Sequence, residues 1–150
     1  MCESPFMARA IRLAEEAAIR GEVPVGCVIV DGETGEILGE SANRTEEHRD
    51  PTAHAELAAL REACAKAGSP RLAKADLYVT LEPCAMCAAA ISLARIRRLY
   101  YGAYDPKMGA VDHGPRFFQS PSCHHRPEVI AGMSERRCGQ LLKIFFAERR

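Results

Sequence analysis

Two short motifs constrain this chain of 150 residues more than any other feature. One is H-x-E at residues 54–56, and the other is P-C-x-x-C at residues 83–87. Catalytic zinc sites take three protein ligands, mostly histidine, cysteine or acidic side chains, and leave a fourth position for water. The motifs therefore predict a site for one Zn²⁺ per subunit, with the ligands His54, Cys84 and Cys87.

The spacing of these residues predicts how the chain folds around the metal. Cys84 and Cys87 are three positions apart, so they share one face of a helical turn. His54 and Glu56 are two positions apart and can converge only beyond the N-terminal end of a helix, toward which side chains lean. Two helix N-termini are therefore expected to point at one ion, and their partial positive charge favours cysteine thiolates.

Helix-start signals support this arrangement. Asp50 followed by Pro51 indicates an N-cap and a first helical residue, which places His54 within a helix over residues 51–67. Pro83 likewise suits the start of a second helix over residues 84–93.

Glu56 is not needed as a ligand and is predicted to be the catalytic residue. Zinc lowers the pKa of a bound water toward neutrality, and a neighbouring carboxylate can take up the water's proton and return it to a leaving group. A purely structural zinc site has no use for Glu56, which argues against a zinc-stabilised binding module. A C-x-x-C pair on its own would also suit a redox protein, but the H-x-E motif does not.

The segments around the motifs resemble a known family. H-x-E together with P-C-x-x-C is the signature of the zinc nucleobase deaminases. Further segments are similar to the bacterial tRNA-specific adenosine deaminases, and the similarity runs from about residue 6 to the C-terminus. These segments are Val23-Pro24-Val25-Gly26, Asn43, Asp50-Pro51-Thr52-Ala53-His54-Ala55-Glu56, Leu77-Tyr78-Val79-Thr80-Leu81-Glu82-Pro83-Cys84, Gly102-Ala103-Tyr104-Asp105-Pro106-Lys107 and Phe145-Phe146-Ala147-Glu148-Arg149-Arg150.

The resemblance implies a fold and an activity. The fold is α/β, a three-layer α/β/α cytidine-deaminase-like arrangement whose central mixed five-stranded sheet is covered by helices on both faces, in one domain over residues 1–150. The activity is zinc-dependent hydrolytic deamination of adenosine to inosine at the wobble position of a tRNA anticodon. The implied partners are the anticodon stem-loop, by family precedent of an arginine tRNA, and a second copy of the chain in a homodimer.

The resemblance also implies how the substrate is held. The residue that matches Asn43 hydrogen-bonds the target nucleotide, and the one that matches Asp105 contacts a neighbouring ribose. Val28 and His54 flank the purine, and Ala55 meets its edge through the backbone.

Charge is distributed unevenly along the chain, although the net charge is zero. Residues 1–75 hold 9 Lys and Arg against 13 Asp and Glu, and residues 76–150 hold 11 against 7. A local basic excess is compatible with phosphate binding, although any one such residue is more often a solvated surface charge than a phosphate contact. The predicted RNA contacts are Lys107, Arg126, Arg149 and Arg150. Met108 and the Pro/His-bearing loop at residues 121–127 depart from the family pattern on the presumed RNA side.

Strands alternate with helices along the chain, which predicts a sheet covered by helices. Expected helices lie at residues 6–20, 51–67, 84–93 and 134–149, and expected strands at residues 25–30, 37–42, 77–81, 99–103 and 128–131. The alternative function is a deaminase of a free base or nucleoside, such as guanine or cytosine, on the same fold. A closed lid would favour that alternative, whereas an open basic rim favours RNA.

The remaining composition predicts a cytoplasmic protein. The chain has no run of about 18 apolar residues, and residues 1–5 lack the basic and apolar order of a signal peptide, so neither a membrane segment nor export is expected. An odd count of seven cysteines argues for ligands and buried thiols rather than disulfides. Cys27, Cys64 and Cys138 are interpreted as packing residues, and Cys123-His124-His125 lacks the further ligand that a second metal would need.

Overall fold

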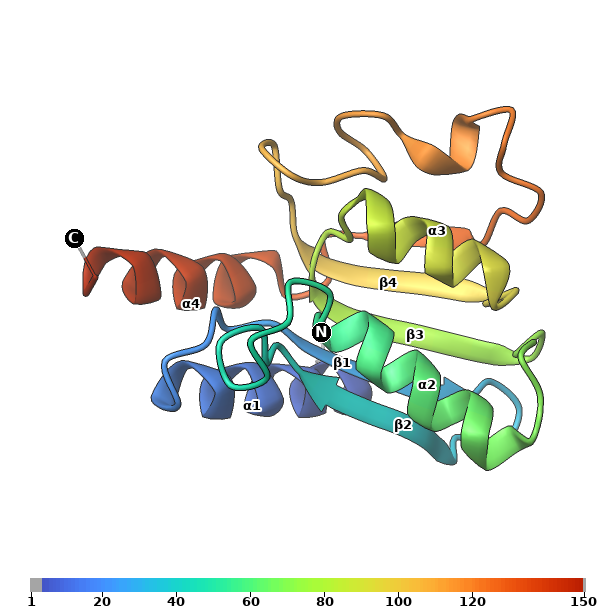
Figure 1. Cartoon of the computed structure of the whole chain (residues 1–150), viewed down its shortest axis with the longest axis horizontal. Coiled ribbons are helices and arrows are strands. Elements are labelled where there is room, and N and C mark those ends of the chain that lie inside the picture. Colours follow the sequence, from blue (N-terminus) through green and yellow to red (C-terminus); the bar gives the residue numbers. More distant parts are fainter. Residues whose placement is uncertain (1–3, 150) are drawn as a thin grey trace.

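The computed structural model describes residues 4–149 and shows a mixed five-stranded sheet between two layers of helices (Figure 1). The strand order is β2-β1-β3-β4-β5, in which β1 runs antiparallel to β2 and β3, and β4 runs parallel to β3 and β5. The predicted three-layer fold is therefore confirmed. The elements are α1 (Pro5–Ile19), β1 (Gly26–Asp31), β2 (Ile37–Ala42), α2 (Ala55–Ala67), β3 (Ala75–Leu81), α3 (Ala85–Leu93), β4 (Arg98–Ala103), a short 3₁₀ helix (Phe117–Gln119), β5 (Glu128–Ala131) and α4 (Glu135–Ala147).

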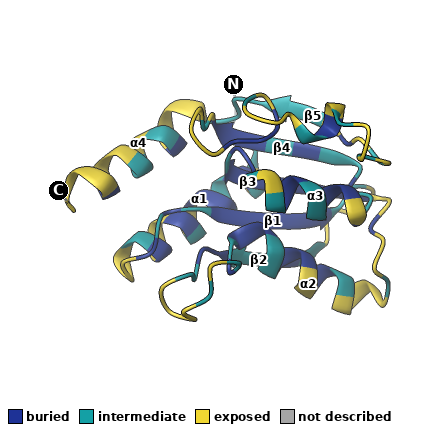
Figure 2. Ribbon diagram, turned by 45° about the horizontal axis from the view of Figure 1, so that its top comes forward, coloured by how far each residue is buried: buried dark blue, intermediate teal, exposed yellow. Residues whose placement is uncertain are grey.

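Each face of the sheet packs against a different pair of helices. Helices α2 and α3 cover one face, and α1 and α4 cover the other (Figures 1 and 2). Successive side chains of a strand point to opposite faces. In β1, Cys27 and Ile29 accordingly belong to the core under α2 and α3, whereas Val28 and Val30 belong to the core under α1. The central strands are buried on both sides, which explains their continuous apolar sequence.

Helix α1 is built to lie close to the sheet. Ser4 caps it, because its hydroxyl accepts hydrogen bonds from the backbone N–H groups of Phe6 and Met7 at 3.2 and 3.5 Å. Its buried residues recur at helical spacing and form one stripe: Met7, Ala10, Ile11, Ala14 and Ala17. The small alanines of this stripe let the helix backbone approach the start of β1.

Helix α1 approaches β1 most closely at Gly26, so a larger residue there is expected to destabilise the protein. A Cβ atom there would lie 1.9 Å from the carbonyl oxygen of Ala10, so α1 would have to move. Gly26→Ala is expected to lower the free energy of unfolding by about 3 kcal/mol, measured by urea denaturation. The matched control is Gly139→Ala in α4, where a Cβ meets nothing within 4 Å. That change is expected to raise stability by about 0.5–1 kcal/mol, and equal effects of the two substitutions would contradict this packing.

The start of α2 corrects one prediction. The helix begins at Ala55 and not at Pro51, and its N-cap is His54 in extended conformation, with φ −79° and ψ 150°. Asp50 is not the N-cap, because its carboxylate closes a separate turn. The backbone N–H and the hydroxyl of Thr52 donate to it at 2.8 and 2.7 Å. As a result, His54 stands at the end of the helix rather than on its side.

The other elements begin and end close to their predicted positions. The strands at residues 37–42 and 128–131 are observed as predicted, and Gly68, with φ 66°, ends α2. Helix α3 begins one residue later than predicted, with Cys84 as its N-cap. The 3₁₀ helix was not predicted. Within residues 4–149, no helix has the length and apolar character that crossing a membrane requires.

Candidate metal and catalytic site

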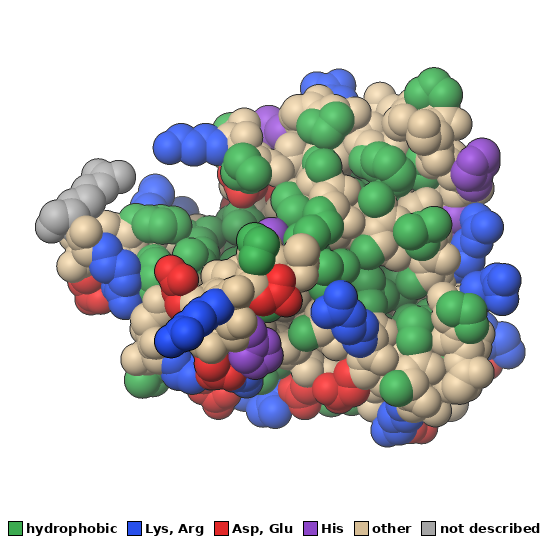
Figure 3. Space-filling view, in the orientation of Figure 1, with side chains coloured by type: hydrophobic (Ala, Val, Ile, Leu, Met, Phe, Trp, Pro, Cys, Tyr) green, Lys and Arg blue, Asp and Glu red, His purple; other side chains and the backbone are tan. Residues whose placement is uncertain are grey.

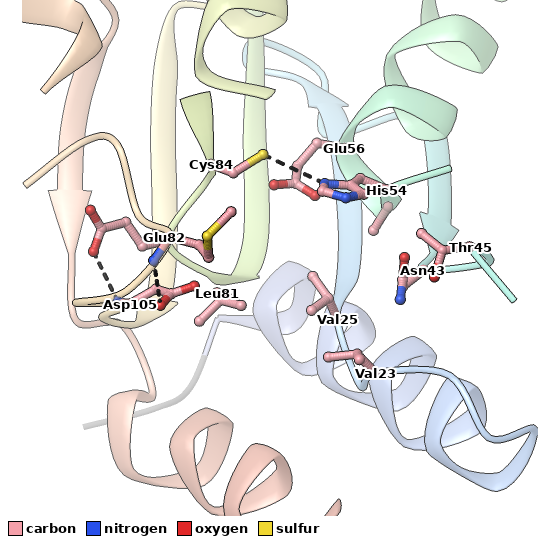
Figure 4. A pocket seen from close by; sticks show the side chains of 12 residues that line it. Val23, Val25, Asn43, Thr45, His54, Glu56, Leu81, Glu82, Cys84 and Asp105 are labelled. Atoms are coloured by element: carbon pink, nitrogen blue, oxygen red, sulfur yellow. Dashed lines mark hydrogen bonds between the residues drawn. The ribbon is translucent and has the colours of Figure 1, made fainter. Parts of the chain in front are cut away.

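The N-terminal ends of α2 and α3 meet at a cluster of three potential metal ligands. His54 directly precedes α2, Cys84 directly precedes α3, and Cys87 lies in the first turn of α3. Their ligand atoms all lie within 4.8 Å of one another. Nδ1 of His54 is 3.6 Å from Sγ of Cys84 (Figure 4) and 3.5 Å from Sγ of Cys87. Among the described residues, this is the one cluster of at least three His, Cys, Asp or Glu side chains that could hold a metal ion.

The spacing of these atoms fits zinc. A tetrahedral ion with Zn–S bonds of about 2.3 Å and Zn–N bonds of about 2.0–2.1 Å holds its nitrogen and sulfur ligands about 3.6 Å apart. The two observed nitrogen–sulfur distances are close to that value. The three side chains therefore need little rearrangement to bind one ion.

The ionisation of the cluster also favours a cation. The pKa of Cys84 is lowered to about 4, because a hydrogen bond from Cys87, and then one from His54, stabilise its thiolate against the effect of burial. The pKa of Cys87 is raised, first because its thiol donates that hydrogen bond and then because it is buried. The pKa of His54 is raised by its hydrogen bond to Cys84. A divalent cation would take the place of these hydrogen bonds and would favour the thiolate form of both cysteines.

Glu56 lies beside the cluster in the first turn of α2 and is only 4% exposed. Burial, and then the negative charge of Cys84, raise its pKa to about 7. The buried thiol of Cys27 is adjacent, and burial together with the charge of Glu56 raises the pKa of that thiol. A carboxyl group with a pKa near neutrality can both take up and release a proton, which is the requirement for general acid–base chemistry.

A cavity of about 300 Å³ opens over these groups (Figure 4). Asn43 and Thr45 stand on one side of it and Glu82 and Asp105 on the other, with His54 between them. This volume is at the lower end of the range for small-molecule sites. The residues that line the cavity are Val23, Val25, Asn43, Thr45, His54, Ala55, Glu56, Leu81, Glu82, Cys84, Asp105 and Met108.

The structure brings most of the predicted substrate-binding residues to this cavity. Asn43, Ala55 and Asp105 line it, and Asn43 is largely buried. Val28 is the exception, because it is fully buried in the core under α1. It points to the opposite face of the sheet from Cys27, so it does not line the cavity, and the structure does not support its predicted contact with the purine.

A second, larger groove of about 740 Å³ adjoins the cavity and reaches α4. The two share Val23, Leu81, Asp105 and Met108, so they form one continuous depression. Figure 3 shows hydrophobic side chains along α4 on this side of the molecule, with basic side chains nearby. The other residues that line the groove are Tyr104, Lys107, Leu142, Lys143, Phe146, Ala147 and Arg149.

The predicted basic residues fall in different places. Lys107 and Arg149 line the groove, as does Lys143, which the sequence did not single out. Arg126 is exposed but lines neither the cavity nor the groove. Arg150 lies outside the described residues.

The Cys-His-His segment at residues 123–125 holds its loop against α3 and the residues that follow it. Sγ of Cys123 donates to the carbonyl oxygen of His125 at 3.0 Å, and the hydroxyl of Ser92 donates to the same oxygen at 2.8 Å. Nε2 of His125 lies 2.7 Å from the carbonyl oxygen of Ile96. These contacts give Cys123 and His125 a role in anchoring the loop.

Thr45 and Glu82 line the cavity, and the sequence-based prediction missed both. Thr45 has no pattern of its own in the sequence. Glu82 does leave a signal, because it is an acidic residue between an apolar strand and the P-C-x-x-C motif, where a charge is buried only if it is paired or hydrogen-bonded.

Comparison with known proteins places this site in a family. The cytidine and deoxycytidylate deaminase zinc-binding region matches residues 2–103. The tRNA-specific adenosine deaminase of Agrobacterium fabrum is 56% identical over 97% of this chain and 94% of its own length. A solved structure from biochemical and structural studies of A-to-I editing by tRNA:A34 deaminases at the wobble position of transfer RNA superposes with a TM-score of 0.88. It is 56% identical and covers 91% of this chain and 98% of its own.

A solved guanine deaminase from Bacillus subtilis is less similar, with a TM-score of 0.65 and 32% identity over 99% of this chain and 94% of its own. The family region includes the H-x-E and P-C-x-x-C motifs, and the two relatives at 56% identity match nearly the whole chain. The chain therefore belongs to the zinc-binding cytidine and deoxycytidylate deaminases and, among them, to the tRNA-specific adenosine deaminases.

Proposed function

We propose that this protein converts adenosine to inosine by hydrolysis at the wobble position of a tRNA anticodon. The observation that carries the proposal is the cluster of His54, Cys84 and Cys87 at the bottom of a base-sized cavity, with the buried acid Glu56 beside it. Relatives named for this activity share 56% of their residues with the chain, which supports the choice of substrate.

The ligands proposed for one zinc ion per chain are His54, Cys84 and Cys87. When bound, the ion supplies Lewis acidity, which brings the pKa of a water molecule toward neutrality. The three residues would hold it from two helix N-termini, whose partial positive charge favours the thiolate forms of Cys84 and Cys87.

Glu56 is proposed to move protons and not to bind metal. Its carboxylate accepts one proton from the attacking water and delivers it to a ring nitrogen of the purine. It then carries the second proton of that water from the new hydroxyl group to the amino group, which leaves as ammonia. The low exposure of Glu56 and its pKa of about 7 support this role, because a carboxyl group with a pKa near neutrality can both take up and release a proton.

The walls of the cavity are proposed to hold the target nucleotide. Asn43 offers an amide that can hydrogen-bond the base or its ribose, and Ala55 offers its backbone at the start of α2. Asp105, at the border of cavity and groove, is suited to contact the neighbouring ribose. Single-stranded loops are the usual targets of base-specific RNA recognition, because their bases can be turned out at low cost.

The groove beside the cavity favours RNA over a free base. Its open shape continues from the catalytic cavity to α4, and it combines Lys107, Lys143 and Arg149 with the partly exposed aromatic ring of Phe146. Basic residues that track a backbone and aromatic rings that stack on bases are the two elements of single-stranded nucleic acid binding.

Removing charge from this groove gives a prediction. Lys107→Ala and Arg149→Ala are each expected to weaken binding of an anticodon stem-loop. The slope of the logarithm of the binding constant against the logarithm of the salt concentration should become less negative by about 0.7 for each lost phosphate contact. Fluorescence anisotropy over a range of salt concentrations measures both quantities. Lys74→Ala, at an exposed lysine outside both cavity and groove, is the matched control. Slopes that stay equal in all three variants would contradict a phosphate role for the groove.

A substrate panel tests the proposed function. We expect efficient release of ammonia from an anticodon stem-loop with adenosine at the wobble position and poor release from free adenosine, guanine and cytosine. The alternative, a free-base deaminase, is favoured by the likeness to the guanine deaminase of Bacillus subtilis. Faster deamination of free guanine than of the stem-loop would replace the first proposal with the second.

The finer features of the proposal are that the enzyme acts in the cytoplasm, on an arginine tRNA, and as a homodimer. The family resemblance supports all three.

A further inference from the structure

A single buried carboxylate organises one wall of the catalytic cavity. The side chain of Glu82 is 0% exposed and faces five N–H donors. Its Oε1 accepts from the backbone of Asp105 at 3.0 Å and lies 2.8 Å from Nδ1 of His113. Its Oε2 accepts from the backbone N–H groups of Val111, Asp112 and His113 at 3.1, 2.9 and 3.1 Å. Both ends of the segment at residues 105–113 are therefore tied to one side chain.

The middle of the segment packs directly on Glu82 and on the P-C-x-x-C motif. A Cβ atom at Gly109 would lie 2.5 Å from Cδ and Oε2 of Glu82, so only glycine fits there without a shift. Gly109 pairs with Cys84 in a short antiparallel bridge, and the N–H of Ala110 donates to the carbonyl oxygen of Pro83 at 2.9 Å. The carboxylate thus sits between the strand end and the segment and holds the two together.

The same segment presents side chains to the substrate side. The carboxylate of Asp105 accepts from the backbone N–H groups of Lys107 and Met108 at 3.2 and 3.1 Å, which closes a tight turn. Asp105 and Met108 line the catalytic cavity, and Lys107 lines the groove. Figure 4 shows Glu82 beside Asp105, with the hydrogen bond between them. The place of the turn is therefore set from inside the protein by Glu82.

We propose that Glu82 is a positioning residue for substrate binding, which acts by fixing the backbone of residues 105–113 so that Asp105 and its turn stand at the rim of the cavity. This inference rests on the proposed function, because it assigns Asp105 to the nucleotide beside the target. Glu82 itself contributes no ligand to the metal cluster, so its effect is on substrate affinity rather than on the proton transfers of Glu56.

Charge is essential to this role. All five neighbours are donors, and a carboxylate offers only acceptors, whereas the amide of glutamine would turn an NH₂ group toward at least one N–H. A charged carboxylate therefore satisfies all five N–H groups at once. Glu82→Gln keeps the shape of the side chain and removes this interaction with its donors.

The test is steady-state deamination of the anticodon stem-loop by zinc-loaded Glu82→Gln. We expect KM to rise about tenfold or more while kcat stays within about threefold of the unmodified enzyme. Zinc should remain at one ion per chain. Hydrogen exchange at the amides of residues 105 and 111–113 should accelerate about tenfold, with the amides of β3 unchanged. Gly109→Ala displaces the same segment while Glu82 stays intact, and it is expected to give the same rise in KM. If Glu82→Gln does not fold, this variant tests whether the position of the segment controls KM.

Two comparisons separate positioning from general stability. Asp76→Asn removes another buried carboxylate, which lies at the start of β3 away from the cavity and pairs with Arg97 at 2.8 Å. This substitution should lower the melting temperature and leave KM unchanged. In an Asp105→Ala background, Glu82→Gln should raise KM less than about threefold, because the contact it positions is already gone.

An unchanged KM, or an equal rise with and without Asp105, would overturn the proposal. The unmodified enzyme is measured first on the stem-loop, so its inactivity there would refute the proposed function and not the role of Glu82. In that event the exchange rates of the four amides decide whether Glu82 holds the segment.

Discussion

Replacing Glu56 with alanine will lower turnover of the anticodon stem-loop about 10³-fold while zinc and fold remain, because positioned acid–base groups contribute about 10²–10⁴ to rate. The side chain is buried beside the metal cluster and is not one of its three ligands. The substitution therefore removes the proton carrier alone. Single-turnover kinetics, zinc analysis and circular dichroism on the same preparation measure the three quantities together.

The matched control is Glu62→Ala, which makes the same change on an exposed turn of α2. It should leave turnover unchanged. If Glu56→Ala retained a tenth or more of the activity, proton transfer would have to pass through another group, and the role assigned to Glu56 would be refuted.

Replacing Cys87 with alanine will remove zinc and stability together. Cys87 is fully buried, and without it only His54 and Cys84 remain as ligands, which bind zinc more weakly than the full set of three. Zinc that binds only the folded state adds about 4 kcal/mol to the free energy of unfolding when its free concentration is near 1,000 times its Kd. We expect zinc content near zero by plasma mass spectrometry and a loss of free energy of unfolding of that order.

Cys64→Ala provides the comparison, because Cys64 is a half-buried free thiol on α2 outside the metal cluster. It should keep one zinc per chain. Chelation of zinc from the unmodified protein should lower its stability to about that of Cys87→Ala. A Cys87 variant that still binds one zinc with unchanged melting temperature would exclude this thiol as a ligand.

Much of the fold follows from local patterns in the sequence. Apolar strands alternate with amphipathic helices, and this pattern predicts the covered sheet that is observed. The start of α2 was predicted four residues too early, because an aspartate such as Asp50 can either cap a helix or close an isolated turn. An aspartate that accepts an N–H two residues ahead serves an N-cap and an isolated turn equally well, and only the tertiary contacts distinguish them.

The metal cluster of the candidate site was predictable from the sequence, whereas the walls of its cavity were not. The spacing of the two motifs predicts that His54 and the cysteines converge, because it restricts them to helix ends, and the structure places them together. The walls of the cavity come from segments far apart in the chain, so Thr45 and Glu82 have no shared pattern. Val28 was assigned by resemblance alone, and the alternation of side chains along β1 places it on the other face of the sheet.

The most direct test of the account is deamination of the anticodon stem-loop in water enriched in ¹⁸O, followed by mass spectrometry of the nucleosides. We expect inosine at the wobble position only, carrying one ¹⁸O atom from water, with one ammonia released per inosine and no reaction after removal of zinc. Absence of inosine at that position, or inosine that carries no oxygen from water, would contradict it.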